Sequence, residues 1–126
     1  MIKIKLTNED IDNWIAALRS GKYKQGYNGL LHDILDNFCC LGVLCDVHPE
    51  IKKNKNKTVF TGGYMYFNRS AWISDFVNFP YDLQDELMYM NDEKRFSFSA
   101  IADYIEENRN KIINRQEPSE RPDRTD

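Results

Sequence analysis

The residues best suited to chemistry are crowded into one stretch, NFCCLGVLCDVHP, at residues 37–49, which holds all three cysteines and one of the two histidines. A nucleophilic cysteine needs a low pKa and some exposure to solvent. Cys39 and Cys40 fall in the first turn of a predicted helix, where the helix dipole favours a thiolate, and His32 or His48 could serve as the partner base. A thiol-dependent enzyme is therefore one hypothesis for this chain.

The same stretch fits a metal site poorly and a buried helix well. Cys45 and His48 are three residues apart and could share a helical face, but no second pair of ligands completes a closed zinc site. Apolar residues cover nearly all of residues 38–47, which is typical of a helix buried on every side. We therefore favour a structural role for the cysteines and predict no metal, no cofactor and no catalytic residue.

A second set of residues has the composition of a binding site. Polar and aromatic side chains in loops, held by a rigid core, are the usual makings of such a site. The candidates lie in the first loop, at the end of the buried helix and in a late predicted turn: Tyr23, Gln25, Gly26, Gly29, Asp46, Asn91 and Asp92. The alternative is that the glycines only serve turns, Asp46 anchors a loop and Asn91 caps a helix.

The lysine-rich segment EIKKNKNK at residues 50–57 reads as a polar loop after Pro49. We include Lys52 and Lys53 among the candidate ligand-binding residues, because ammonium groups there could meet the phosphates of a nucleotide. A solvated loop with no ligand is the ordinary alternative for such a run.

The remaining elements predict a single α+β domain over residues 1–114, mainly helical, with a disordered tail over residues 115–126. Thr7 and Ser97 are helix caps, each followed by an apolar stripe with helical spacing. Two short β-rich runs around Gly62-Gly63 predict an antiparallel β-hairpin over residues 58–67.

Composition narrows the cellular setting. The chain has 126 residues, 41% of them hydrophobic, which is enough for a packed core. No apolar run is long enough to cross a membrane, and the N-terminus, MIKIKLTNED, lacks the apolar segment of a secretory signal, so we predict a cytoplasmic protein without a membrane partner. A net charge of −3 disfavours nucleic acid as a partner.

Several blocks of the sequence together resemble a widespread, uncharacterised family of small tailed-phage and prophage proteins. These blocks are WIAALRSG at residues 14–21, YKQG at 23–26, FCCLGVLCD at 38–46, Asn91-Asp92 and IADYIEEN at 101–108. The resemblance implies a phage accessory protein that acts in the cytoplasm of a bacterial host.

These observations lead to one preferred function and two alternatives. The preferred one is a counter-defence protein that binds and sequesters a small nucleotide-derived signalling ligand without catalysis. The alternatives are a protein-interaction module that inhibits a host protein, and the thiol-dependent enzyme. The sequence leaves open whether the chain forms a homo-oligomer.

Overall fold

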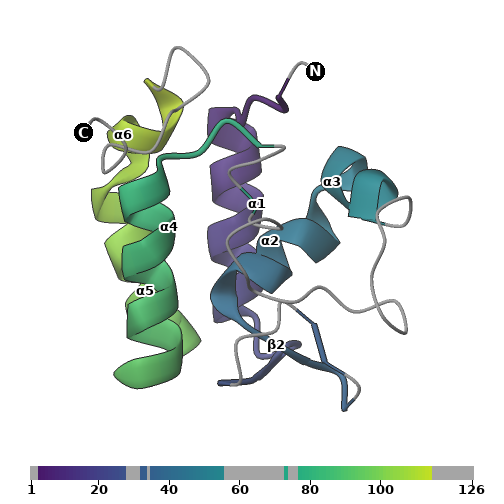
Figure 1. The fold of residues 1–126 in the computed structure, drawn as a ribbon, viewed down its shortest axis with the longest axis vertical. Coiled ribbons are helices and arrows are strands. Elements are labelled where there is room, and N and C mark those ends of the chain that lie inside the picture. Colours follow the sequence, from purple (N-terminus) through teal and green to yellow (C-terminus); the bar gives the residue numbers. More distant parts are fainter. Residues whose placement is uncertain (1–2, 28–31, 34, 56–72, 74–76, 115–126) are drawn as a thin grey trace, which may run out of the picture.

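The computed structural model describes residues 3–27, 32–33, 35–55, 73 and 77–114 (Figure 1). In chain order its elements are α1 (Asn8–Arg19), β1 (Lys24–Gln25), β2 (Asn37–Phe38), α2 (Cys40–Val47), α3 (Pro49–Lys55), α4 (Tyr81–Met88), the π-helix η3 (Tyr89–Glu93), α5 (Phe98–Glu107) and α6 (Arg109–Ile113). Of the residues that the structure describes, 63% are helical.

The predicted α+β class with an antiparallel hairpin is wrong. The sheet has two strands of two residues each, and they run parallel, with Lys24 opposite Asn37 and Gln25 opposite Phe38. Strands this short have no alternating pattern from which a sequence could reveal them. The segment 58–67, where the hairpin was predicted, lies outside the described residues, as does the predicted tail over residues 115–126.

The first helix confirms the sequence-based prediction. Thr7 caps α1 in a reciprocal capping box, in which its hydroxyl accepts the Asp10 N–H at 3.1 Å and the Asp10 carboxylate accepts the Thr7 N–H at 2.9 Å. The apolar stripe of α1 is buried, and Gly21 follows the helix with a φ of 78°, a conformation that glycine adopts without strain.

The helix α2 is the buried central helix that the sequence predicted, but it begins two residues later and a further helix follows it. Its cap is Cys39, whose sulfur accepts the Gly42 N–H at 3.4 Å. Pro49 does not lead into a polar loop: it opens α3, because proline lacks only an N–H that the first turn of a helix leaves unpaired. Part of the lysine-rich segment is therefore helical.

The predicted turn at Asn91-Asp92 is also wrong. These residues belong to η3, which extends α4 by a wider helical turn. Ser97 then caps α5 as predicted, accepting the Ala100 N–H at 3.1 Å.

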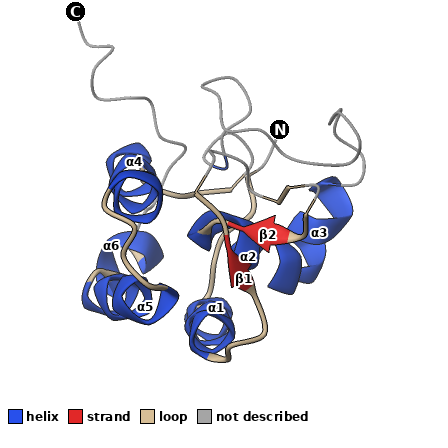
Figure 2. Ribbon diagram, turned by 90° about the horizontal axis from the view of Figure 1, so that it is seen from below, coloured by secondary structure: helices blue, strands red, loops and turns tan. Residues whose placement is uncertain are grey.

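One hydrophobic cluster joins the helices. The helix α1 packs against α5 and α2, and α2 also packs against α3 and α4 (Figures 1 and 2). Trp14 lies in this core, fully buried, and its indole N–H donates to the Cys40 carbonyl at 2.9 Å. Among the described residues, no helix has the length and apolar character needed to cross a membrane. The arrangement places the β1–β2 pair and η3 at the same end of α2, where the candidates Gln25, Gly26, Asn91 and Asp92 meet.

Candidate functional site

Asn91 is the centre of a buried polar junction. Its side chain is fully buried, and its amide nitrogen donates to the Gly26 carbonyl and to the Asp92 carboxylate, each at 2.8 Å. Its amide oxygen accepts the Gln25 side-chain N–H at 3.0 Å and the Cys40 backbone N–H at 3.2 Å. Both donors and both acceptor positions of the amide are used, so Asn91 has no hydrogen-bonding capacity left for a ligand.

The residues that bond to Asn91 also form hydrogen bonds within the same junction. The second N–H of the Gln25 amide donates to the Phe96 carbonyl at 2.8 Å, and the Gly26 N–H donates to the Phe38 carbonyl at 2.8 Å. A Cβ at Gly26 would lie 2.9 Å from the Cβ of Asn37, so only glycine fits this approach of the two strands. Three of the candidate residues, Gln25, Gly26 and Asn91, therefore hold β1, α2 and η3 together.

Asp92 lies at the edge of this junction and is half-buried. Desolvation raises the pKa of its carboxyl group, although the hydrogen bond from Asn91 acts in the opposite direction. Its position beside Asn91 assigns it to the junction and not to an open pocket.

A separate group of candidates surrounds Asp46 at the end of α2. The Tyr23 hydroxyl donates to one carboxylate oxygen of Asp46 at 2.6 Å, and the Lys52 ammonium lies 3.3 Å from the other. Burial, followed by the hydrogen bond and the negative charge of Asp46, raises the pKa of the Tyr23 hydroxyl well above its ordinary value. Tyr23 is therefore a fixed, neutral donor.

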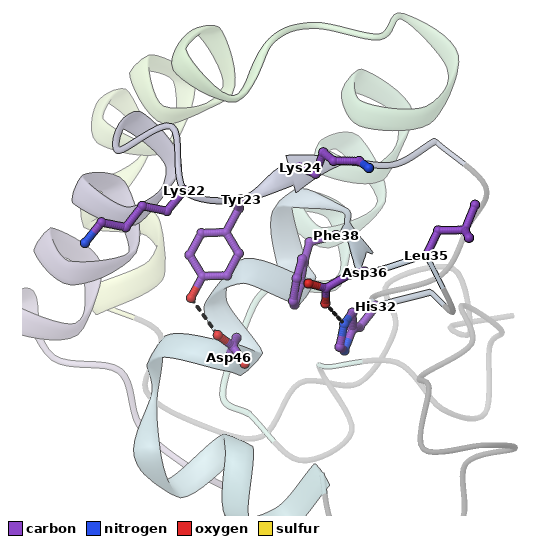
Figure 3. A pocket seen from close by; sticks show the side chains of 8 residues that line it. All are labelled: Lys22, Tyr23, Lys24, His32, Leu35, Asp36, Phe38 and Asp46. Carbon is purple, nitrogen blue, oxygen red and sulfur yellow. Dashed lines mark hydrogen bonds and ion pairs between the residues drawn. The ribbon is translucent and has the colours of Figure 1, made fainter.

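Tyr23 and Asp46 of this group line an open pocket of about 400 Å³ (Figure 3). Its lining residues are Lys22, Tyr23, Lys24, His32, Leu35, Asp36, Phe38 and Asp46. The ring of Tyr23 meets that of Phe38 edge to face at 4.9 Å, and His32 stacks on Phe38 at 4.1 Å. In Figure 3 the Lys22 and Lys24 side chains extend away from each other on either side of Tyr23. The pocket thus combines aromatic walls with cations at its rim.

The far wall of the pocket is built by a tight turn. The buried Asp33 carboxylate accepts the N–H groups of Leu35 and Asn37 at 2.9 and 2.8 Å, which fixes the chain before β2. Asp36 sits in this turn with a φ of 65°, and its carboxylate lies 2.6 Å from the His32 ring nitrogen. The turn therefore aims a histidine–aspartate pair at the pocket.

Sequence reasoning found only part of this pocket. It singled out Tyr23 and Asp46 but missed Lys22, Lys24 and Asp36 as lining residues. Lys22 and Lys24 flank Tyr23 directly, and that alternation of cation and aromatic was the available signal. Gly29 lies outside the described residues, as does the side chain of Lys53, while Lys52 pairs with Asp46.

The cysteines are all buried, as a structural role requires. Burial raises the pKa of the Cys39 and Cys40 thiols well above the ordinary value, so both side chains are neutral thiols. The thiol-dependent hypothesis needed an exposed sulfur beside a histidine, and these sulfurs do not offer one. Among the described residues there is also no group of three or more side chains able to hold a metal ion.

The chain matches one protein family over residues 6–85, which is more than half of its length. It belongs to DUF8296. This family is described as a domain of unknown function. The match includes the FCCLGVLCD block but ends before Asn91 and the IADYIEEN block. No curated protein and no solved structure matches the chain.

Proposed function

We propose that this DUF8296 protein is a phage accessory protein that binds a small nucleotide-derived signalling ligand and sequesters it, without catalysis, from a host defence system. The observation that carries the proposal is the pocket beside Tyr23, which combines aromatic walls with lysines at its rim. Aromatic side chains bind the heterocycle of a nucleotide by stacking, and ammonium groups bind its phosphates.

The proposal places the ligand differently from the sequence-based candidate set. The heterocycle lies against the rings of Tyr23 and His32, and the phosphates meet Lys22 and Lys24. Asp46 holds the Tyr23 hydroxyl in place, and Lys52 neutralises the second oxygen of that carboxylate. The Asn91 junction does not line the pocket, but it holds β1, the strand that carries Lys24, through the Gln25 side chain.

Sequestration without turnover agrees with the chemistry of the described residues. The buried, neutral thiols of α2 are poor nucleophiles. The phage origin and the role in counter-defence rest on the resemblance of the sequence blocks, and the pocket supplies the chemistry that such a role needs.

Thermal unfolding in the presence of a panel of cyclic nucleotides and ADP-ribose derivatives tests the proposal. A ligand at about 100 times its dissociation constant adds about 2.7 kcal/mol to the free energy of unfolding, which should raise the midpoint by roughly 10 °C in a domain of this size. Mass analysis of the recovered ligand should return it intact, whereas an altered ligand would indicate an enzyme.

Two charge reversals locate the site. Lys24→Glu should weaken binding about tenfold by placing an anion beside the phosphates. Lys5→Glu, at an exposed lysine that does not line the pocket, is the matched control and should bind as the native protein does. Equal effects of the two variants would contradict the proposed site, and no shift with any compound would leave the protein-interaction alternative as the better account.

A further inference from the structure

Three exposed aromatic side chains gather around one loop, apart from the pocket. Of the four large hydrophobic side chains that are exposed in the described part of the chain, Tyr89, Phe96 and Tyr27 are 50%, 40% and 39% exposed. The Lys94 ammonium lies 5.9 Å from the ring centres of both Tyr89 and Phe96, and the Arg95 guanidinium lies 4.8 Å from the ring centre of Tyr27. We call these five residues the η3 patch.

The backbone of the η3 patch is fixed before any partner arrives. The Lys94 N–H donates to the Tyr89 carbonyl and the Phe96 N–H donates to the Met90 carbonyl, each at 3.0 Å. The Phe96 carbonyl in turn accepts from Gln25 of the buried junction. Arg95 has a φ of 54°, a strained conformation for a residue with a side chain, and the surrounding bonds hold it. Little conformational entropy is lost when such a surface binds.

Clustered exposed rings of this kind mark an interaction surface, because aromatic residues are enriched where proteins bind each other. The charges of the loop indicate the partner. Its sequence is Asp92-Glu93-Lys94-Arg95, two acids followed by two bases. A nucleic acid would meet the exposed Glu93 carboxylate, and a partner of a single charge would be repelled by one half of the loop.

A second copy of the same chain satisfies both halves. When two copies of the loop face each other across a two-fold axis, they run antiparallel, so that Glu93 of one copy meets Lys94 of the other, and the reverse contact forms at the same time. The aromatic rings on either side of the loop then cover one another.

We propose that the η3 patch is the interface of a two-fold symmetric homodimer. The interface is small, so the dimer is weak and forms reversibly with concentration. Its charge pairs lie at the surface, so added salt weakens it. The proposal is independent of the ligand pocket, since none of the five patch residues lines that pocket.

Sedimentation equilibrium over the micromolar range tests the proposal with charge reversals at two exposed positions. The variant E93K places two cations opposite two cations across the axis, and K94E places two anions opposite two anions. Each should raise the dimer dissociation constant at least about tenfold, because the symmetry repeats the repulsion twice. The double variant E93K/K94E restores opposite charges across the axis and should dimerise as the native chain does.

Mixing the two single variants provides a second test, in which the mixture is compared with each variant alone. Because one carries two cations and the other two anions at these positions, the mixture should form a heterodimer when neither variant dimerises alone. A native chain that stays monomeric throughout the concentration range would overturn the proposal. So would a dimer that is insensitive to the single reversals, or single variants that remain monomeric when mixed.

Discussion

Replacing Asn91 with alanine removes four hydrogen bonds from a site that water cannot reach. The Gly26 carbonyl and the Cys40 N–H lose the partner that Asn91 provides, and both residues are buried. Each buried backbone group left without a partner costs about 1–3 kcal/mol, so we expect Asn91→Ala to lower the free energy of unfolding by about 2–6 kcal/mol. Domains of this size are stable by about 5–15 kcal/mol, so a large share would be lost.

Urea unfolding followed by tryptophan fluorescence measures this loss, because Trp14 is buried and bonded to Cys40 at the edge of the junction. Asn13→Ala is the matched control: Asn13 lies exposed on α1, and its replacement should change stability by less than about 0.5 kcal/mol. A loss below about 1 kcal/mol for Asn91→Ala would refute the assignment of this residue as the structural centre of the junction.

Two further predictions concern the same end of the molecule. Gly26→Ala should lower the free energy of unfolding by about 1–3 kcal/mol and weaken ligand binding, because the new Cβ would lie 2.9 Å from the Cβ of Asn37. The control Gly21→Ala has open space around it, so it should lower the free energy of unfolding by about 1 kcal/mol, through backbone strain alone, and leave binding unchanged. Burial raises the pKa of the Cys39 and Cys40 thiols above the ordinary 9.0, so their contribution to stability is complete below that pH and falls above it by about 1.4 kcal/mol per pH unit and thiol. The urea midpoint should therefore decline between about pH 8 and pH 10, and it should decline less steeply in Cys40→Ala. A midpoint that does not change with pH would contradict the argument from burial.

The helices were predictable where the information that defines them is local. Thr7 with Asp10, and Ser97 ahead of Phe98, mark helix starts within a few residues, and the apolar stripes of α1 and α5 repeat with helical spacing. The buried nature of α2 followed from its continuous apolar run. The cap of α2 could not be predicted from the sequence, because a cysteine sulfur is an unusual acceptor for a helix N-terminus.

The junction and the pocket could not be read from sequence in the same way. Asn91 bonds to Gly26 across 65 positions and to Cys40 across 51, and no periodic pattern records such a contact. Tyr23, Asp46 and Asn91 are all polar residues near predicted loops, so the sequence alone indicates a single surface. The structure divides them by burial, which leaves Tyr23 and Asp46 at a pocket and withdraws Asn91 into the interior.

The position of Asn91 shows that the region matched by the family and the region joined by contacts in the structure have different bounds. The family match ends at residue 85, yet the amide that completes the hydrogen bonds of β1 and α2 comes from residue 91, and α5, which packs against α1, lies further on. The matched region is therefore smaller than the unit that these hydrogen bonds and helix contacts hold together. A relative with only the matched region must provide a different group for the Gly26 carbonyl and the Cys40 N–H, and residues 25, 26, 40 and 91 should be inherited together or replaced together.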